Sequence, residues 1–276
     1  MPDASRGWLA RLELAFDREG CRTRLARRAH EGPLVVQKPL YPEGGEVCQC
    51  IVVHPPGGIA GGDRLELAID VQAGAHAQLT TPGAAKWYRA AGRRASQQLR
   101  FGVAASGVLE WLPQPTILFD AVDAQSDVHI ELEADARYIG WDIVCLGRTA
   151  SSERFGCGAW RQRIDAVREG ALIWSERAAL RGGDPLLGSA AGLNGAPVFG
   201  TFVAMAAILD DDLIAACRRV SPPGGEGAVT RLPHALVGRY RGESSEAAQD
   251  YFRALWAAVR PAVVGRAAVV PRIWNT

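Results

Sequence analysis

Alternation of apolar and polar residues is the dominant pattern over the first 200 positions of the chain. This period of two is typical of a half-buried strand, because successive side chains of a strand point to opposite faces of the sheet. The clearest stretches are Ala95–Val103, Gly107–Leu112, Asp127–Leu132 and Ala136–Val144. Clusters of glycine and proline separate such stretches, and no long amphipathic helix pattern occurs before about residue 204. We therefore expect residues 1–203 to be β-rich.

The pattern changes to a helical period near the C-terminus. DDDLIAACRRV, at 210–220, carries acidic residues in its first turn and arginines in its last, as the helix dipole favours. EAAQDYFRALWAAVR, at 246–260, has one apolar face made of Ala247, Ala248, Tyr251, Phe252, Leu255, Trp256 and Val259. Ser244 or Ser245 can cap this second helix, and Pro261 is expected to end it. The sequence thus predicts two helices within 204–276.

A short leader, a turn and a strand recur along the chain. The turn residues Gly74, Gly107, Ala136 and Gly170 follow one another at intervals of 29 to 34 residues. If such units stack with no helix between them, they form a β-solenoid or layered sheets. Chance similarity of glycine-rich and alanine-rich turns is the alternative. The predicted fold class is mainly β, with β-helix or solenoid-like layered sheets and two α-helices near the C-terminus, in a single domain over 1–276.

The repeat also places polar residues at equivalent positions. Six residues after the four turns stand Thr80, Pro113, Asp142 and Glu176. Stacked units would align Thr80, Asp142 and Glu176 along one face, where hydroxyl and carboxylate groups could form a path for a hydrated cation. Acidic strand ends in water are the alternative interpretation.

Two thiols and an imidazole are close together in the sequence. Cys48, Cys50 and His54 would share one face of a strand, and such groups suit a borderline metal ion such as nickel or zinc. We favour the other interpretation, in which the cysteines are small buried hydrophobic residues, because further ligands are not evident.

Two loops carry unusual residues. HPPGGIAGGD, at 54–63, predicts a tight turn system that presents His54 and Asp63, and it lacks the Lys-Ser/Thr pair of a phosphate-binding P-loop. LTTPGAAKWYRA, at 79–90, places Lys86, Tyr88 and Arg89 after a Pro-Gly turn. These three residues form either a docking surface, where such side chains are favoured, or a solvated loop.

Composition narrows the class of protein. A net charge of +1 gives no electrostatic reason to expect binding to nucleic acid or to an anionic membrane. Apolar runs stay well short of the roughly 20 residues that a membrane span needs, and charges occupy the N-terminus where a signal peptide is apolar. Neither GxSxG nor HExxH occurs. We expect a cytoplasmic protein that is not an enzyme.

Eight blocks, in order, carry a resemblance to a known family. They are LYPEG (40–44), HPPGGIAGGD (54–63), LTTPGAAKWYRA (79–90), LEWLPQPTILF (109–119), GWDIVCLGR (140–148), WSERAAL (174–180), GLNGAPVFGT (192–201) and PRIWNT (271–276). Together they resemble the UreD family, some of whose members are called UreH. The resemblance implies a helical-β fold and a non-catalytic partner of UreF, of the GTPase UreG through UreF, and of apo-urease. It also implies an internal tunnel that passes nickel toward the urease active site, so nickel is expected in transit and no cofactor is expected to be tightly bound.

The resemblance assigns roles to particular positions. Asp63, Asp142 and Glu176 match polar, tunnel-associated parts of the family, while Lys86, Tyr88 and Arg89 lie in a block near the passage or a partner surface. Gln49 stands where the family often has histidine, which counts against a shared metal site at Cys48 and Cys50. An interaction module without a metal path remains the alternative function. Aromatic residues that look exposed, such as Trp87 and Trp256, further suggest that a UreF-like partner stabilises the chain.

Overall fold

The computed structural model describes residues 7–207 and 209–275. Residues 1–6, which form the start of the N-terminal segment considered above, lie outside the described residues, as do Ile208 and the final residue of the PRIWNT block. The prediction of a single domain over 1–276 stays a prediction.

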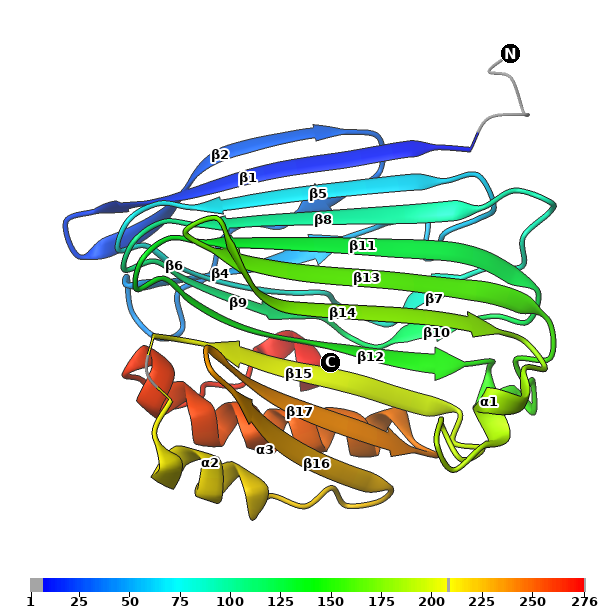
Figure 1. Cartoon of the computed structure of the whole chain (residues 1–276). Coiled ribbons are helices and arrows are strands. Elements are labelled where there is room, and N and C mark those ends of the chain that lie inside the picture. The colour runs from blue at the N-terminus through cyan, green and yellow to red at the C-terminus, as the bar shows by residue number, and fades with distance from the viewer. Residues whose placement is uncertain (1–6, 208, 276) are drawn as a thin grey trace.

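Across the described residues the strands form two facing sheets (Figure 1). The first sheet has the order β14-β13-β11-β8-β5-β1-β2. Its strands are β1 (Leu9–Glu19), β2 (Arg22–Glu31), β5 (Arg64–Val71), β8 (Ala95–Val103), β11 (Val122–Leu132), β13 (Gly158–Arg168) and β14 (Ala171–Arg181).

The second sheet has the order β16-β17-β15-β12-β9-β6-β4-β3, and the short strands β7 and β10 pair beside β12. Its strands are β3 (Val35–Val36), β4 (Val47–Val53), β6 (His76–Thr80), β7 (Ala85–Trp87), β9 (Val108–Leu112), β10 (Thr116–Leu118), β12 (Arg137–Leu146), β15 (Val198–Met205), β16 (Glu226–Leu232) and β17 (Ala235–Gly242). The hairpin of β16 and β17 lies inside the C-terminal part for which only helices were predicted. β16 is an edge strand that is mostly exposed, so it lacks the apolar alternation by which strands are recognised.

Stacking of the repeated units explains the middle of the fold. The chain passes from the first sheet to the second at β5–β6, β8–β9 and β11–β12, and equivalent strands pair in parallel. His76 is paired with Val108, which is paired with Arg137. The mainly β, solenoid-like fold class is thereby confirmed.

The fourth repeat does not stack. Gly170 joins β13 to β14 as an antiparallel hairpin within the first sheet. Glu169 and Gly170 both have positive φ, 49° and 76°, which is the backbone of the tight turn that suits a two-residue hairpin. Stacking therefore extends over the units at Gly74, Gly107 and Ala136 and does not include the unit at Gly170.

Two helices, α2 (Asp211–Arg218) and α3 (Ser245–Val264), lie along the outer face of the second sheet (Figure 1). Both match the predicted segments. A single turn, α1 (Pro185–Gly188), lies apart from them at one end of the sandwich. Short 3-10 turns occur at Thr149–Ser151 and Arg272–Asn275. Ser244 caps α3 as predicted, since its hydroxyl accepts a hydrogen bond from the backbone of Ala247.

Pro261 does not end α3, contrary to the prediction. The helix continues to Val264 and ends at Gly265, which has a φ of 80°. A proline removes one helical hydrogen bond, and its ring crowds the carbonyl of the residue four positions earlier. Val263 is nevertheless buried in the layer between the second sheet and the helices, so packing keeps the last turn helical.

Hydrophobic residues gather in two layers, one between the sheets and one between the second sheet and the helices. Trp87 lies in the first and Trp256 in the second, and each is 1% exposed. Trp87 packs edge-on against Trp160, with 5.4 Å between ring centroids. The expectation that these two tryptophans are exposed is wrong, because both rings fill core positions.

Over the described part of the chain, none of the helices has both the length and the apolar character needed to cross a membrane.

Candidate functional site

A cavity of about 110 Å³ lies between the two sheets. Most of its wall is apolar, with Trp111, Tyr138 and Trp174 among the larger side chains. The polar residues that interrupt this wall are Thr81, Gln97, Gln114, Thr116, Ser126, Asp142, Gln162 and Thr201. Polar side chains that converge inside an apolar enclosure are the usual mark of a binding or transit site.

Asp142 is the carboxylate of this cavity. It lies on β12, directly opposite Thr201 of β15, and its carboxylate accepts a hydrogen bond from the side-chain amide of Gln162 on β13. Burial raises the pKa of Asp142 to about 6; the amide of Gln162 lowers it, and the nearby charge of Glu176 raises it further. The carboxylate is therefore held by neutral donors, the side chain of Gln162 and the backbone of Ile143, and not by a cation of its own.

Glu176 lies beside the cavity, next to Thr201 of its wall. It is on β14 opposite Ile164, and its Oε1 accepts a hydrogen bond from the hydroxyl of Thr201 at 3.1 Å. Arg239, on β17, donates from Nη1 to the same hydroxyl at 2.6 Å, and its Nη2 lies 2.7 Å from Glu176 Oε2. The structure thus places Glu176 close enough to Asp142 to act on its pKa, and it adds Arg239, which the sequence analysis missed. A role of the two acids in a passage stays a prediction.

Neighbouring cavities extend this space in two directions. A cavity of about 330 Å³ shares Thr81, Gln97 and Trp111 with the central one, and it reaches the loops of His54 and Lys86. On the other side, a groove of about 350 Å³ shares Thr201 with the central cavity and includes Arg239. The shared residues place the three spaces in a row through the sandwich.

Thr80 does not lie with the two acids. It is paired with Leu112 on the face covered by the helices, where its hydroxyl donates to the Leu112 carbonyl and accepts from Trp274 Nε1. The sheet register aligns Gly107 with Ala136 but leaves Gly74 one position out of line. A shift of one residue moves a strand side chain to the opposite face, so the expected alignment of Thr80 with Asp142 is wrong. Thr81 lines the cavity instead.

Asp63 stabilises its own loop through hydrogen bonds to the backbone. Its two carboxylate oxygens accept hydrogen bonds from the backbone amides of Trp8 and Ala60, both at 2.8 Å. These bonds hold the loop at 60–63 against the start of β1. Asp63 also acts on His54, whose pKa is lowered by burial while the carboxylate opposes the shift. A role of Asp63 in a passage stays a prediction.

The loop residues Lys86, Tyr88 and Arg89 are placed at one end of the sandwich. Lys86 is exposed and lines the cavity of about 330 Å³, and Arg89 is exposed. Tyr88 packs edge-on against Phe119 with 5.0 Å between ring centroids, and its ring lies under Gly58, where a Cβ atom would come within 2.2 Å. The close approach of the Tyr88 ring explains why a residue without a side chain stands at position 58 of the PPGG turn. Whether the three residues form a partner surface stays a prediction.

Cys48 and Cys50 are buried in β4, among the apolar residues of the core. The Cys48 thiol donates to the hydroxyl of Tyr41 at 3.6 Å. The Cys50 thiol donates a hydrogen bond to Cys48, and this bond lowers the pKa of Cys48. The pKa of Cys50 is raised by the same hydrogen bond and by burial. Within residues 7–207 and 209–275, no group of three or more His, Cys, Asp or Glu side chains is arranged to hold a metal ion. The hydrophobic interpretation favoured above fits this environment.

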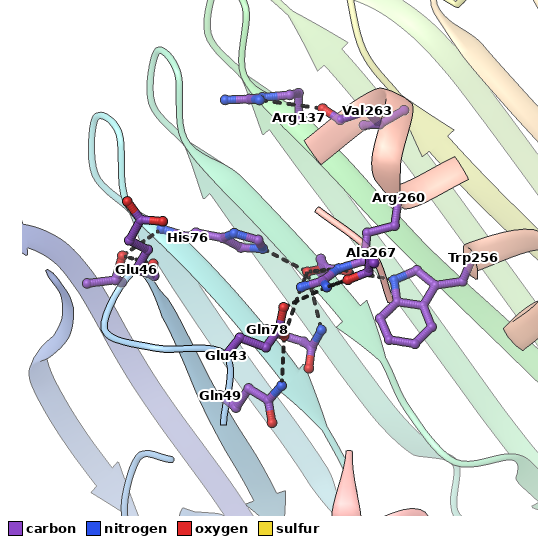
Figure 2. Close-up of polar contacts among 12 residues, drawn as sticks. Glu43, Glu46, Gln49, His76, Gln78, Arg137, Trp256, Arg260, Val263 and Ala267 are labelled. Atoms are coloured by element: carbon purple, nitrogen blue, oxygen red, sulfur yellow. Dashed lines mark hydrogen bonds and ion pairs between the residues drawn. The ribbon is translucent and has the colours of Figure 1, made fainter. Parts of the chain in front are cut away.

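A second polar cluster, under α3, was missed by the sequence analysis (Figure 2). Arg260 is fully buried, and it contacts Glu110 of β9 at 3.0 Å and Glu43 at 2.7 Å. His76 Nε2 lies 2.7 Å from Glu110, and Trp256 Nε1 donates to the same carboxylate at 2.6 Å. The signal was present in LEWL and in the helical face, since a charged residue falls among apolar positions in both. The signal does not show that Glu110 and Arg260 are partners, because the two residues are 150 positions apart in the chain.

Burial alone would raise the pKa of Glu110. The hydrogen bonds and charges of His76 and Arg260 outweigh it, so the pKa falls to about 2. This cluster therefore holds an ionised carboxylate with its full set of partners and leaves it no need of a ligand.

The fold is that of a solenoid-like β scaffold with an internal cavity. Comparisons with known proteins identify its family. The family model described as "UreD urease accessory protein" matches residues 9–275. Urease accessory protein UreD of Dechloromonas aromatica is 50% identical over 279 residues, covering 100% of this chain and 97% of the relative. The proteins of the same name from Azoarcus sp. and from Pseudomonas fluorescens strain Pf0-1 are 48% and 52% identical, covering 99% and 98% of this chain and 96% and 95% of the relatives. The chain belongs to the UreD urease accessory protein family.

Proposed function

We propose that this chain acts in the maturation of urease as a non-catalytic scaffold in the cytoplasm. In this proposal it binds apo-urease and UreF, and through UreF the GTPase UreG. Nickel passes through the space between its sheets on the way to the urease active site. The observation that supports the proposal is the set of neighbouring cavities, with Asp142 in the wall of the central one and Glu176 bonded to its Thr201.

The chemistry of the cavity suits an ion in transit. A divalent cation loses part of its hydration shell in a narrow space, and carboxylate oxygens offset that cost. A complete shell of protein ligands would trap the ion, whereas here the acids are few and alternate with amide and hydroxyl groups. The central cavity of about 110 Å³ leaves room for a few waters beside a cation.

Blocking the cavity tests the proposal. Asp142→Leu and Glu176→Leu, each co-expressed with apo-urease and the other accessory proteins, should lower the nickel content of purified urease. Their complexes should still assemble in a pull-down. Asp127→Leu is the matched control, because Asp127 lies outside the sandwich on β11, where it contacts Gln125. Normal nickel content in both cavity variants, with normal assembly, would leave only the alternative function of an interaction module without a metal path.

Partner binding is tested separately. A partner that binds only the folded chain raises its melting temperature by mass action. We expect such a rise on mixing with UreF, together with co-elution in gel filtration. An unchanged melting curve without co-elution would contradict the proposed complex.

A further inference from the structure

The sandwich has an open side where the second sheet runs past the edge of the first. β14 is the edge strand of the first sheet, while β15, β17 and β16 continue the second sheet beyond it (Figure 1). Glu176 of β14 and Arg239 of β17 meet across this gap, with Thr201 between them. The contact lies where the central cavity and the outer groove share Thr201.

Arg239 and Glu176 form an ion pair in which Oε2 of Glu176 has no well-aligned hydrogen bond. That oxygen is buried, and Arg239 Nη2 lies only 2.7 Å away. The side chain of Glu176 is 14% exposed, whereas that of Arg239 is 48% exposed. The acid is thus held against Thr201 of the cavity wall, and the guanidinium of Arg239 is attached to a long side chain that reaches in from solvent.

From this geometry we propose that Arg239 is a displaceable latch, whose guanidinium occupies the position of a divalent cation at Glu176 and closes the side of the cavity. The inference rests on the proposed passage and adds a regulator to it. The positive charge of Arg239 competes with an arriving cation for Glu176 and Thr201, and it weakens retention of the ion in transit. Arg239 is half-exposed and lines the groove, so its guanidinium can swing out into the groove and be hydrated there, while an arriving cation replaces it at Glu176.

Arg241 is a matched comparison on the same strand. It also pairs with an acid, Glu226, but through aligned hydrogen bonds of 2.8 and 3.1 Å from Nη2 and Nε. Glu226 has a side chain that is 64% exposed and lines the outer groove, away from the central cavity. Arg241, whose side chain is 29% exposed, is more buried than Arg239, and removing it takes one positive charge from the same strand without freeing Glu176.

Nickel binding to the purified full-length chain tests the latch. By isothermal titration calorimetry at pH 7.5, Arg239→Gln should bind Ni²⁺ about tenfold more tightly than wild type, from the loss of one neighbouring charge in a partly screened site. Arg239→Met, which keeps an apolar stem, should show the same gain. The double variant Arg239→Gln/Glu176→Gln should lose that gain, and Arg241→Gln should bind as wild type does.

Several results would overturn the latch. The latch is wrong if Arg239→Gln and Arg239→Met are folded and bind Ni²⁺ no more tightly than wild type. An equal gain in Arg241→Gln would show a general charge effect, and failure of both Arg239 variants to fold would show a structural role. Circular dichroism and thermal melting establish the folded state of each variant.

The latch and the proposed function can fail independently. If Asp142→Leu impairs nickel loading of urease while Arg239→Gln leaves Ni²⁺ affinity unchanged, the passage stands and the latch is wrong. If Arg239→Gln tightens Ni²⁺ binding while Asp142→Leu loads urease normally, the latch stands as a property of the site and delivery through it is wrong.

Discussion

Two carboxylates of the same sheet show opposite behaviour. Glu110 of β9 faces α3, and Asp142 of β12 faces the cavity between the sheets. Burial opposes ionisation of both, yet the pKa of Glu110 falls to about 2 and that of Asp142 rises to about 6. Partners make the difference, because Glu110 has Arg260, His76 and Trp256, whereas Asp142 has the neutral amide of Gln162 and the acid Glu176 nearby.

The comparison separates a structural site from a site that can accept a ligand. Arg260 joins α3 to Glu110 and Glu43, so the cluster ties the helix to β9 and to the chain before β4. A buried pair of this kind is costly to break, because loss of one partner leaves a charge without compensation. Asp142 is buried without a cationic partner, so its ionised form is costly to the fold, and such a cost at one place is common where function requires it.

Glu110→Gln is expected to have the largest effect on stability. The change leaves part of the charge of Arg260 without its buried partner, so the free energy of unfolding at pH 7 should fall by about 3–5 kcal/mol. Urea unfolding followed by circular dichroism measures it. Glu226→Gln, which removes an exposed ion pair, should cost less than about 1 kcal/mol. Equal losses in the two variants would show that the cluster under α3 adds nothing beyond a surface pair.

The same carboxylate should make stability depend on pH at the acid end. Because the pKa of Glu110 is lower in the folded chain than its ordinary value of 4.5, its ionised form stabilises the fold above about pH 4.5. That contribution, about 3 kcal/mol in size, is lost as the pH falls from 4.5 toward about 2. The difference in unfolding free energy between wild type and Glu110→Gln should therefore shrink between pH 6 and pH 3. A difference that stays constant over this range would contradict the assignment.

Asp142→Asn should act in the opposite direction. The pKa of Asp142 is raised from its ordinary 3.8 to about 6, so its neutral form favours the fold and that advantage is lost as the pH rises through 6. At pH 7.5 the asparagine should stabilise the chain by about 2 kcal/mol, and the gain should vanish below about pH 4. Thermal or urea unfolding at both pH values measures this. Asp127→Asn, outside the sandwich, should change stability by less than about 0.5 kcal/mol. Destabilisation by Asp142→Asn at pH 7.5 would count against an uncompensated carboxylate in the cavity.

The smallest expected effect concerns Thr80, on the helix-covered face. Thr80→Val removes the acceptor of Trp274 Nε1 and should cost about 1 kcal/mol, the usual worth of one neutral hydrogen bond. Thr80→Ser keeps the hydroxyl and serves as the control. The free energies of unfolding of the two variants should differ by most of that amount. Equal values would mean that this hydrogen bond does not hold the C-terminal turn.

Local sequence was sufficient for the fold class and for most of the elements, although not for the hairpin of β16 and β17. Period-two alternation located β8 and the end of β11, because burial of one sheet face imposes that period on the side chains. The acidic first turn of α2 and the serine cap of α3 located the two helices for an equally local reason. The spacing of turns further indicated the stacked units, because each of those units repeats the same crossover between sheets.

Tertiary structure decided which of the polar residues meet. One residue of register moved Thr80 out of the cavity and Thr81 into it. Positive φ values at Glu169 and Gly170 form the tight turn that makes the fourth unit a hairpin. Glu176 of this hairpin nevertheless lies near Asp142, from the opposite sheet. Arg239 and Arg260 meet acids that are 63 and 150 positions away in the chain. Sequence alone determines the type and face of an element through local periodicity, whereas contacts between distant charges depend on register and packing, which no local pattern encodes.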